Sequence, residues 1–459
     1  MPDLGGQLHE HVEALFPICR SITGEGLRET LCYIGRLLPL EVREVPSGTR
    51  VLDWTVPPEW TIRDAFIATL GGGRVVDFRR NNLHILQYSM PVDRVVTRQE
   101  LASHLYSLPD QPDLIPYRTA YYGDAWGFCV ADRDRQALTD DSYHVRIDST
   151  LAPGNLSYGE CFLPGSSSNE VLFSAHCCHP SLANDNLSSI AVTIELARWL
   201  MRAPRRFSYR LLFMPGTIGA IAWLHANRDC VHRIEYGLVL TCLGDPAPIS
   251  YKRTRRSSAA IDRYAAAVLR EEGHAHRVHP FMPTGYDERQ YCSPGFNLPV
   301  GCLMRSPGGT FPEYHTSADN LDLVQPGALA DSLRILQRIV HLIERDEVWR
   351  NASPYGEPQL GRRGLYAPIG GDLSTQTYDQ TTLLWVLNLS DGEHSLFDIA
   401  ERSGRPFDAV VAAAEALARV GLLQRDLLVA RHSDFDWLKS GGSSRGNSRC
   451  SRRTTRERG

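Results

Sequence analysis

One stretch near the middle of the chain combines histidines and a carboxylate in a spacing that suits a metal site. His176 and His179 belong to His-Cys-Cys-His-Pro, and Asp185 lies in the Asn-Asp-Asn-Leu-Ser-Ser run that follows. A catalytic zinc typically takes three such protein ligands and keeps one position for water. The thiols of Cys177 and Cys178 offer a different chemistry, nucleophilic attack with His179 as the base. Adjacent cysteines after a strand are more often structural, so we favour the metal site.

A second polar stretch, residues 313–321, reads Glu-Tyr-His-Thr-Ser-Ala-Asp-Asn-Leu and supplies His315. Together with His176 and Asp185 it completes a set of three zinc ligands, the third of them distant in sequence. A plainer interpretation makes His176 a core histidine and Asp185 a helix N-cap. We expect all three to be ligands. His179 is a weaker candidate, as a substitute ligand or as a partner of one.

A third stretch, residues 285–292, reads Gly-Tyr-Asp-Glu-Arg-Gln-Tyr-Cys. Asp287, Glu288 and Arg289 are more ionisable groups than a simple connector needs. They either form a salt-bridged loop that shapes the fold or take part in catalysis and substrate binding. We expect the second, because both this stretch and the one around His315 lie in turn-rich sequence around the predicted sheet.

The elements that must position these residues alternate between strand and helix from residue 165 onward. Apolar runs at 171–175, 210–214 and 236–241 are typical of buried parallel strands, and the segments 187–202 and 218–227 have helical periodicity. This alternation predicts βαβ units and a mainly parallel sheet. In such sheets the ligand crevice lies at the carboxyl ends of the strands, which is where His176 and Asp185 are expected.

The chain divides into several predicted domains. Short strand-like pieces and Gly/Pro turns indicate a β-rich domain over residues 51–164, inserted into an α/β domain made of residues 1–50 and 165–350. A Gly- and Pro-rich linker follows over residues 350–372. Three short helices and a two-stranded wing, with strands at 421–423 and 427–429, then resemble a winged-helix domain over residues 360–435. The Ser/Gly/Arg-rich tail, residues 440–459, is expected to be disordered.

Charge and composition limit the classes of partner. The formal net charge is −4, but residues 440–459 hold six Arg and one Glu, so the rest of the chain carries −9. An acidic body argues against a nucleic-acid partner, as does the scarcity of Lys and Arg in the segment 407–420, the expected recognition helix. Residues 1–10 show neither a basic n-region nor an apolar h-region, so we expect no secretory signal, and no run reaches the length of a membrane span. We therefore expect a cytoplasmic protein with reduced thiols and no membrane partner.

These three motifs carry a resemblance to a known family. A strand-end His, an Asp-Asn-Leu-Ser-Ser run that opens a helix and a late His-Thr motif are similar to the co-catalytic zinc aminopeptidase clan. Residues 10–435 more closely resemble bacterial aminopeptidase-like proteins labelled as polysaccharide-biosynthesis-associated, which have a β-rich insert and a C-terminal winged helix. The resemblance implies a zinc-exopeptidase-like α/β fold that binds one or two zinc ions. It implies His176, Asp185 and His315 as ligands, with Asp245 as a further carboxylate ligand.

The chain departs from the clan after the strand at residues 210–214. Clan enzymes place two glutamates there, one as general base and one as ligand, whereas this chain has Pro-Gly-Thr-Ile-Gly at residues 215–219. A zinc hydrolase needs a base within reach of the attacking water. The expected substitutes are the carboxylates of Asp287, Glu288 and Glu313. The expected substrate-binding residues are Tyr286, Arg289 and Arg305, and each of the two arginines could hold a carboxylate through paired hydrogen bonds.

The function that these residues predict is metal-dependent hydrolysis of an amide bond in a small molecule or short peptide, in a biosynthetic pathway. The main alternative is a non-hydrolytic, aminopeptidase-like binding or scaffold protein, which the missing glutamate pair motivates. Transcriptional regulation through the winged helix is disfavoured by the charge. The sequence leaves the substrate and a homo-oligomeric state open.

Overall fold

The computed structural model describes residues 4–273, 275–365 and 378–425, and the chain consists of two compact units, Met1–Ile339 and Val340–Gly459. The centre of the first unit is an eight-stranded sheet with the order β1-β10-β12-β11-β13-β16-β14-β15. Its four central strands run parallel to one another. They are β12 (Ser208–Met214), β11 (Glu170–His176), β13 (Ile234–Leu240) and β16 (Val300–Met304).

The outer strands complete the sheet on both sides. On one side β10 runs antiparallel to β12 and β1 antiparallel to β10, and on the other β14 runs antiparallel to β16 and parallel to β15. Their bounds are β1 (Leu40–Pro46), β10 (Asn155–Leu163), β14 (Ile249–Lys252) and β15 (His276–His279). The sheet is therefore mixed, with a parallel centre as the alternating pattern predicted.

The register of the central strands brings their carboxyl ends to one edge. His176 is paired with Met214, Ala175 with Leu240, and Leu240 with Leu303. Every residue of β11 is buried, as expected for a strand covered on both faces. The loops that follow β11, β12, β13 and β16 thus begin side by side.

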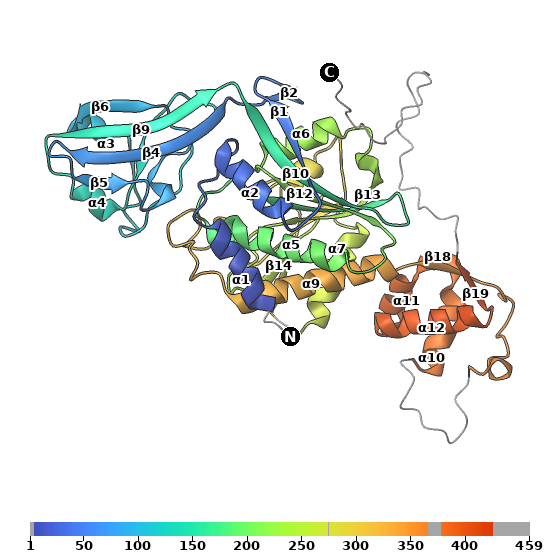
Figure 1. Ribbon diagram of the computed structural model, residues 1–459. Coiled ribbons are helices and arrows are strands. Elements are labelled where there is room, and N and C mark those ends of the chain that lie inside the picture. The colour runs from blue at the N-terminus through green and yellow to red at the C-terminus, as the bar shows by residue number, and fades with distance from the viewer. Residues whose placement is uncertain (1–3, 274, 366–377, 426–459) are drawn as a thin grey trace, which may run out of the picture. The chain divides into compact units, whose positions relative to one another are not determined.

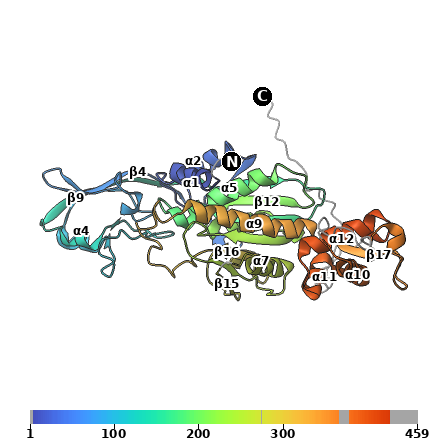
Figure 2. The same cartoon turned by 90° about the horizontal axis from the view of Figure 1, so that it is seen from below.

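Helices cover the sheet. Figures 1 and 2 show α1 and α5 layered against it, and α5 contacts β11 and β12. Trp223 of α6 belongs to a buried cluster with Leu172 of β11 and Leu212 of β12. The helices of this part are α1 (Leu4–Leu15), α2 (Glu25–Gly35), α5 (Ser189–Leu200), α6 (Ile218–Ala226), α7 (Ala260–Glu271), α8 (Glu288–Tyr291) and α9 (Pro326–Arg345). Residues 340–345 of α9 belong to the second unit.

A separate four-stranded antiparallel sheet, order β5-β4-β9-β6, lies between β1 and β10 in sequence (Figure 1). Its strands are β4 (Glu59–Thr69), β5 (Arg74–Asp77), β6 (Val92–Thr97) and β9 (Ser142–Ala152). The other short elements are β2 (Arg50–Val51), β3 (Trp54–Thr55), β7 (Leu105–Tyr106), β8 (Phe128–Cys129), α3 (Arg98–Ala102) and α4 (Asp132–Gln136). We call residues 51–152 the β-rich insert. Its core is continuous with Cys178, Ile218 and Ile221 of the α/β part.

Within its described residues, the second unit contains a domain built from three α-helices and three strands. Its sheet has the order β18-β17-β19. The elements are β17 (Val348–Asn351), α10 (Gln380–Leu389), β18 (Asp391–Ser395), α11 (Leu396–Ser403), α12 (Phe407–Arg419) and β19 (Leu423–Arg425). The predicted second wing strand at 427–429 and the tail at 440–459 lie outside the described residues.

Two boundaries differ from the sequence analysis. The predicted β-rich domain, residues 51–164, includes β10, which instead pairs with β1 and β12 of the eight-stranded sheet. In the second unit, β17 pairs with both β18 and β19, so the structured part of the winged-helix domain starts at Val348, before the predicted linker at 350–372 and not at residue 360. A four-residue strand followed by a Gly/Pro-rich segment is too short to show periodicity. The helices at 380–389, 396–403 and 407–419 agree with the pattern predicted for a winged helix.

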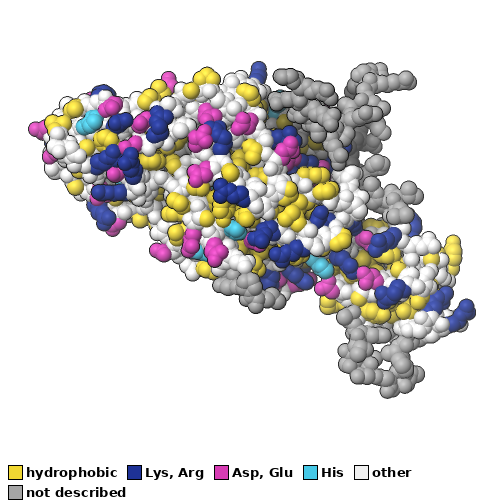
Figure 3. All heavy atoms as spheres, in the orientation of Figure 1, with side chains coloured by type: hydrophobic (Ala, Val, Ile, Leu, Met, Phe, Trp, Pro, Cys, Tyr) yellow, Lys and Arg dark blue, Asp and Glu magenta, His cyan; other side chains and the backbone are white. Residues whose placement is uncertain are grey.

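Figure 3 shows Lys and Arg interspersed with Asp and Glu on one face of the molecule. No helix among the described residues is long and apolar enough to cross a membrane. The ten cysteines within the described residues are all free thiols.

The buried centre of the sheet leads to a stability prediction. Phe173 of β11 is fully buried and stacks on Tyr209, with 6.2 Å between ring centroids. Phe173→Ala should lower the free energy of unfolding by about 3–5 kcal/mol, because it removes buried apolar surface and leaves a cavity. Urea unfolding monitored by circular dichroism measures this change.

The control for this prediction is Phe162→Ala in the same sheet, where the side chain is 42% exposed. It should cost less than about 1 kcal/mol. Equal losses for the two variants would contradict the assignment of Phe173 to the core.

Candidate metal centre

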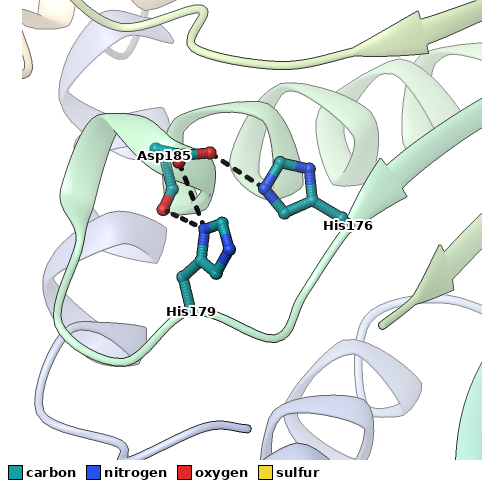
Figure 4. Close-up of side chains that lie close together, drawn as sticks. All are labelled: His176, His179 and Asp185. Atoms are coloured by element: carbon teal, nitrogen blue, oxygen red, sulfur yellow. Dashed lines mark hydrogen bonds and ion pairs between the residues drawn. The ribbon is translucent and has the colours of Figure 1, made fainter. Parts of the chain in front are cut away.

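Two of the predicted ligands stand at the ends of neighbouring elements. His176 is the last residue of β11, and Asp185 lies in the segment Ala183–Ser188, where its own backbone is not helical and which leads directly into α5. Figure 4 shows His176 projecting from the strand end and His179 projecting from the loop, both toward the Asp185 carboxylate. The strand and the helix therefore fix the two sides of the site, and the loop between them carries the second histidine.

Three imidazoles surround the Asp185 carboxylate. Oδ1 lies 2.9 Å from His176 Nε2, and Oδ2 lies 3.2 Å from His179 Nδ1 and 3.0 Å from His315 Nε2. The His176 and Asp185 side chains are almost completely buried, whereas His315 is 33% exposed. The structure thus brings together the three predicted ligands, although 130 residues separate Asp185 from His315.

His179 has a larger place in the site than the sequence analysis gave it. The donor atoms of His176, His179 and Asp185 all lie within 4.8 Å of one another, and the His179 ring is also buried. The sequence signal was its position three residues after His176. Because that segment is an irregular loop and not a helix, spacing alone did not predict where the ring points.

Burial and charge act strongly on these groups. Burial is the largest influence on Asp185, but the neighbouring imidazoles outweigh it and hold the pKa of the carboxyl well below its usual range. Burial lowers the pKa of His176 to about 4 and also lowers the pKa of His315. For His179 the Asp185 carboxylate overcomes the effect of burial and raises the pKa well above its ordinary value.

A second layer of contacts fixes the backbone around Asp185. The Asp319 carboxylate accepts hydrogen bonds from the backbone N–H groups of Asn184 (2.5 Å) and Asp185 (3.0 Å). Asn186 Nδ2 lies 3.1 Å from His176 Nδ1, and Asn186 Oδ1 accepts from Cys242 N–H. Partners of this kind set the orientation of ligand side chains. Asp319 is in the same motif as His315, but the sequence analysis assigned it no role.

Aromatic rings enclose the imidazoles. Tyr286 stacks on His176 with 3.6 Å between centroids, and its hydroxyl lies 3.5 Å from His179 Nε2. Tyr314 stacks on His315 at 3.9 Å. Tyr117 of the β-rich insert contacts the rings of both His179 and His315 edge to face. The site is therefore a cluster of polar side chains surrounded by aromatic rings.

The donor set fits a zinc ion. Imidazole and carboxylate ligands lie about 2.0–2.2 Å from zinc, so two neighbouring ligands of a tetrahedral site are roughly 3.3 Å apart. The nitrogen–oxygen distances around Asp185, 2.9 to 3.2 Å, are close to that value. Two imidazoles flank Oδ2 but only one flanks Oδ1. His179, His315 and Oδ2 thus offer the more complete set of ligands.

The turn after β12 is different from the clan pattern, and the structure shows what occupies it. A Cβ atom built on Gly216 would overlap the hydroxyl and ring of Tyr286, so Tyr286 fills the space that a side chain would need. The next residue, Thr217, has a positive φ of 62° and donates its N–H to Asp287 Oδ1 at 2.6 Å. A carboxylate therefore does reach this turn, from a different segment of the chain.

The three predicted catalytic carboxylates have different surroundings. Asp287 is buried, its Oδ2 has no hydrogen-bond partner among the described residues, and burial raises the pKa of its carboxyl to about 7. Glu288 is also buried and forms an ion pair with Lys252. Glu313 is half-buried, and its backbone carbonyl accepts from Thr316. Asp287 is the one that contacts the turn after β12.

Two predicted site residues have internal partners. The Asp245 carboxylate accepts hydrogen bonds from Asn184, Ala247 and Ser306, which gives no support to a role as ligand. Arg305 is 7% exposed, and its guanidinium binds the Ala247 and Ala328 carbonyls, the Ser332 hydroxyl and Asp331.

The prediction that Arg305 binds substrate is therefore not supported, because its donors hold α9 against the loop after β13. Arg289 differs from Arg305, because its Nε atom is buried without a hydrogen-bond partner among the described residues.

Comparison with known proteins agrees with the resemblance. Residues 9–346 match the family described as "Domain of unknown function (DUF4910)", and residues 347–425 match a winged helix-turn-helix family. A protein of Clostridium acetobutylicum, provisionally described as a polysaccharide biosynthesis protein with an aminopeptidase-like domain, is 47% identical over 422 residues, which cover 92% of this chain and 97% of that protein.

Solved structures give the same result. A crystal structure of a protein provisionally called a peptidase, from Clostridium acetobutylicum, has 45% identity and a TM-score of 0.86, with 92% of this chain and 96% of that chain covered. A zinc aminopeptidase from Bacillus subtilis has 14% identity and a TM-score of 0.55, with 74% of this chain and 95% of that chain covered. At this identity the likeness concerns the fold alone, and it confirms the predicted zinc-exopeptidase-like α/β fold. The chain belongs to the DUF4910 family, an aminopeptidase-like α/β domain that here carries a C-terminal winged helix.

Proposed function

We propose that the protein is a zinc-dependent hydrolase of aminopeptidase or amidase type that acts on a small amide or a short peptide. The observation that carries this proposal is the buried Asp185 carboxylate with imidazole nitrogens within 3.2 Å of both its oxygens, at the carboxyl edge of a parallel sheet. The name of the Clostridium relative and the fold of the Bacillus zinc aminopeptidase support it. The relative's name also favours a place in a biosynthetic pathway.

His176, His179, His315 and Asp185 would hold the metal. A zinc ion, when bound, polarises a carbonyl group and makes a water molecule nucleophilic near neutral pH. The carboxylate of Asp185 can face two ions or one, because it has an oxygen on each side. All four residues are therefore assigned to the ligand set, for one ion or for two, because imidazoles flank both oxygens of the carboxylate.

Asp287 is the general base in this proposal. Its Oδ1 accepts from Thr217 N–H, and its Oδ2 is left without a partner among the described residues and can accept a proton from the attacking water. A base is most effective when its pKa is near the working pH, and burial raises the pKa of this carboxyl to about 7. Glu288 suits the role less, because Lys252 already pairs with it.

Tyr286 and Arg289 are proposed to contact the substrate. Tyr286 lies over His176 with its hydroxyl toward His179, and the buried Nε of Arg289 has an unused donor. Glu313, which is half-buried in the His315 loop, remains a second candidate for proton transfer.

The second candidate function is a non-hydrolytic binding or scaffold protein. The observation that favours it is the Pro215-Gly216-Thr217 turn, which has no carboxylate of its own. For the winged helix we propose a packing role, since Asp408 and Glu415 of α12 pair with His341 and Arg345. The predicted absence of a nucleic-acid partner stays a prediction, because winged helices can bind nucleic acid.

Loss of a ligand should weaken metal binding. His176→Ala and His315→Ala should each lower zinc affinity by more than about 100-fold, because changes to outer contacts alone cost about 10–100-fold. Zinc content after dialysis, and competition with a chromophoric chelator, measure this. The matched control is His144→Ala in the β-rich insert, an exposed histidine paired with Asp93, which should leave zinc affinity unchanged.

Two results would count against the metal site. Wild-type protein that takes up no stoichiometric zinc after loading would exclude the hydrolase. Equal zinc affinity in His176→Ala and wild type would remove His176 from the ligand set.

The role of Asp287 as base predicts a separation of catalysis from metal binding. Asp287→Asn should lower kcat by about 10²–10⁴-fold while the zinc content stays at the wild-type level. Hydrolysis of a panel of aminoacyl anilides and dipeptides provides the rates. A variant with full activity would show that another group, Glu313 first, is the base, and Glu313→Gln is the matched comparison.

The raised pKa of Asp287 also predicts a pH dependence of stability. A carboxyl whose pKa rises from 3.8 to about 7 on folding stabilises the fold below pH 4, and this contribution is lost as the pH rises through 7. Relative to Asp287→Asn, the wild type should therefore lose stability between pH 4 and 7, at no more than about 1.4 kcal/mol per pH unit. Urea unfolding of chelator-treated protein tests this, and parallel curves for the two proteins would contradict it.

A further inference from the structure

The β-rich insert reaches the loop that carries His315. Its segment 111–121 contains no helix or strand but forms hydrogen bonds with residues 312–317. Tyr117 N–H donates to the His315 carbonyl at 2.7 Å, and Ser317 N–H donates to the Ile115 carbonyl at 2.9 Å. Pro116 and Thr316 form an antiparallel bridge between these two bonds.

Side chains add to this pairing. Ile115 N–H donates to the Ser317 hydroxyl at 3.0 Å, and Gln111 Nε2 donates to the Pro312 carbonyl at 2.9 Å. The contact therefore extends along six residues of the His315 loop.

The backbone of His315 requires such support. Its φ is 56°, in the left-handed region that residues other than glycine seldom adopt. A residue in this conformation costs about 1–3 kcal/mol and persists only where its surroundings determine it. The hydrogen bond from Tyr117 to the His315 carbonyl is part of those surroundings. An insert residue thus helps to set the direction in which His315 faces Asp185.

Tyr117 also contacts the ligand rings themselves. Its ring lies 5.1 Å from the ring of His179 and 5.0 Å from the ring of His315, measured between centroids. The side chain is 5% exposed, and its hydroxyl is 3.0 Å from that of Tyr121. Rings at this distance and angle attract one another and limit rotation.

The insert holds the other ligand loop as well. Tyr117 packs in a small apolar cluster with Leu83 of the insert and with Leu182, which lies between His179 and Asp185. Asn82 of the insert donates to the Ser181 hydroxyl at 2.8 Å and to the Pro17 carbonyl at 2.9 Å. One domain thus contacts the two segments that supply the ligands, at 176–185 and at 315.

We propose that the insert contributes to the metal centre and that Tyr117 is the insert residue that positions the metal ligands. Tyr117 orients His179 and His315 toward Asp185, so metal affinity depends on a residue outside the α/β domain. This inference rests on the proposed function, because it assumes that these histidines bind a metal.

The test compares zinc affinity in three variants of the full chain. Tyr117→Ala removes the ring and should weaken zinc binding by about 10–100-fold, as expected for the loss of an outer contact. Tyr117→Phe keeps the ring and loses only the hydroxyl that faces Tyr121, so its zinc affinity should stay within about threefold of wild type, as expected when packing is retained. Tyr122→Ala is the matched control, since Tyr122 is 52% exposed and packs on Trp54.

A merely structural role would give a different pattern. It would lower the melting temperature of metal-free Tyr117→Ala while leaving the zinc affinity of the folded protein unchanged. Should Tyr117→Ala fail to fold, as judged by circular dichroism, Ser317→Ala removes the hydrogen bond that the Ser317 hydroxyl accepts from Ile115 N–H. This variant should weaken zinc binding in the same direction, by less.

The possible failures can be told apart. Wild-type zinc affinity in folded Tyr117→Ala, or in Ser317→Ala where only that variant folds, would overturn this inference and leave the metal-dependent hydrolase standing. Absence of zinc from the wild type itself would overturn both.

Discussion

The Asp185 carboxylate is the group around which the rest of this structure is arranged. Its side chain is 2% exposed and it faces three imidazoles. A buried charge of this kind is costly unless it is paired and hydrogen-bonded. The carboxylate is paired with His176 at a strand end, with His179 in the loop and with His315 from a distant segment. Asp319 accepts hydrogen bonds from the backbone N–H groups of Asn184 and Asp185 and so fixes the backbone that carries it. A cation between these groups would neutralise the charge of the carboxylate and would have the histidines as its ligands.

Two sets of contacts enclose the histidines, one from the loop that carries Tyr286 and Asp287 and one from the insert. Gly216 leaves space at the end of β12, and Tyr286 fills it. The phenol ring of Tyr286 also packs on His176. The carboxylate of Asp287 then approaches the same turn from the side. Tyr117 of the insert packs against His179 and His315. The centre is thus enclosed by a loop of the α/β domain, residues 286–287, together with a segment of the insert.

The sequence allowed the fold class and much of the site to be predicted, for identifiable reasons. Buried strands and amphipathic helices have clear periods, so β11, β12, β13 and α5 were expected where they occur. His176, Asp185 and His315 were found because each stands beside such an element or in a motif. Other features depend on contacts that have no local signal. The orientation of His179, the support from Asp319, the internal bonds of Arg305 and the pairing of Tyr117 with His315 all join distant or irregular segments.

The central claim is that a zinc ion binds among these imidazoles, and X-ray absorption spectroscopy of the zinc-loaded protein tests it most directly. The account predicts a first shell of four or five nitrogen and oxygen atoms at about 2.0–2.1 Å, with the outer scattering of at least two imidazole rings, and loss of one ring in His315→Ala. A spectrum without imidazole scattering, or one with sulfur ligands at about 2.3 Å, would contradict it.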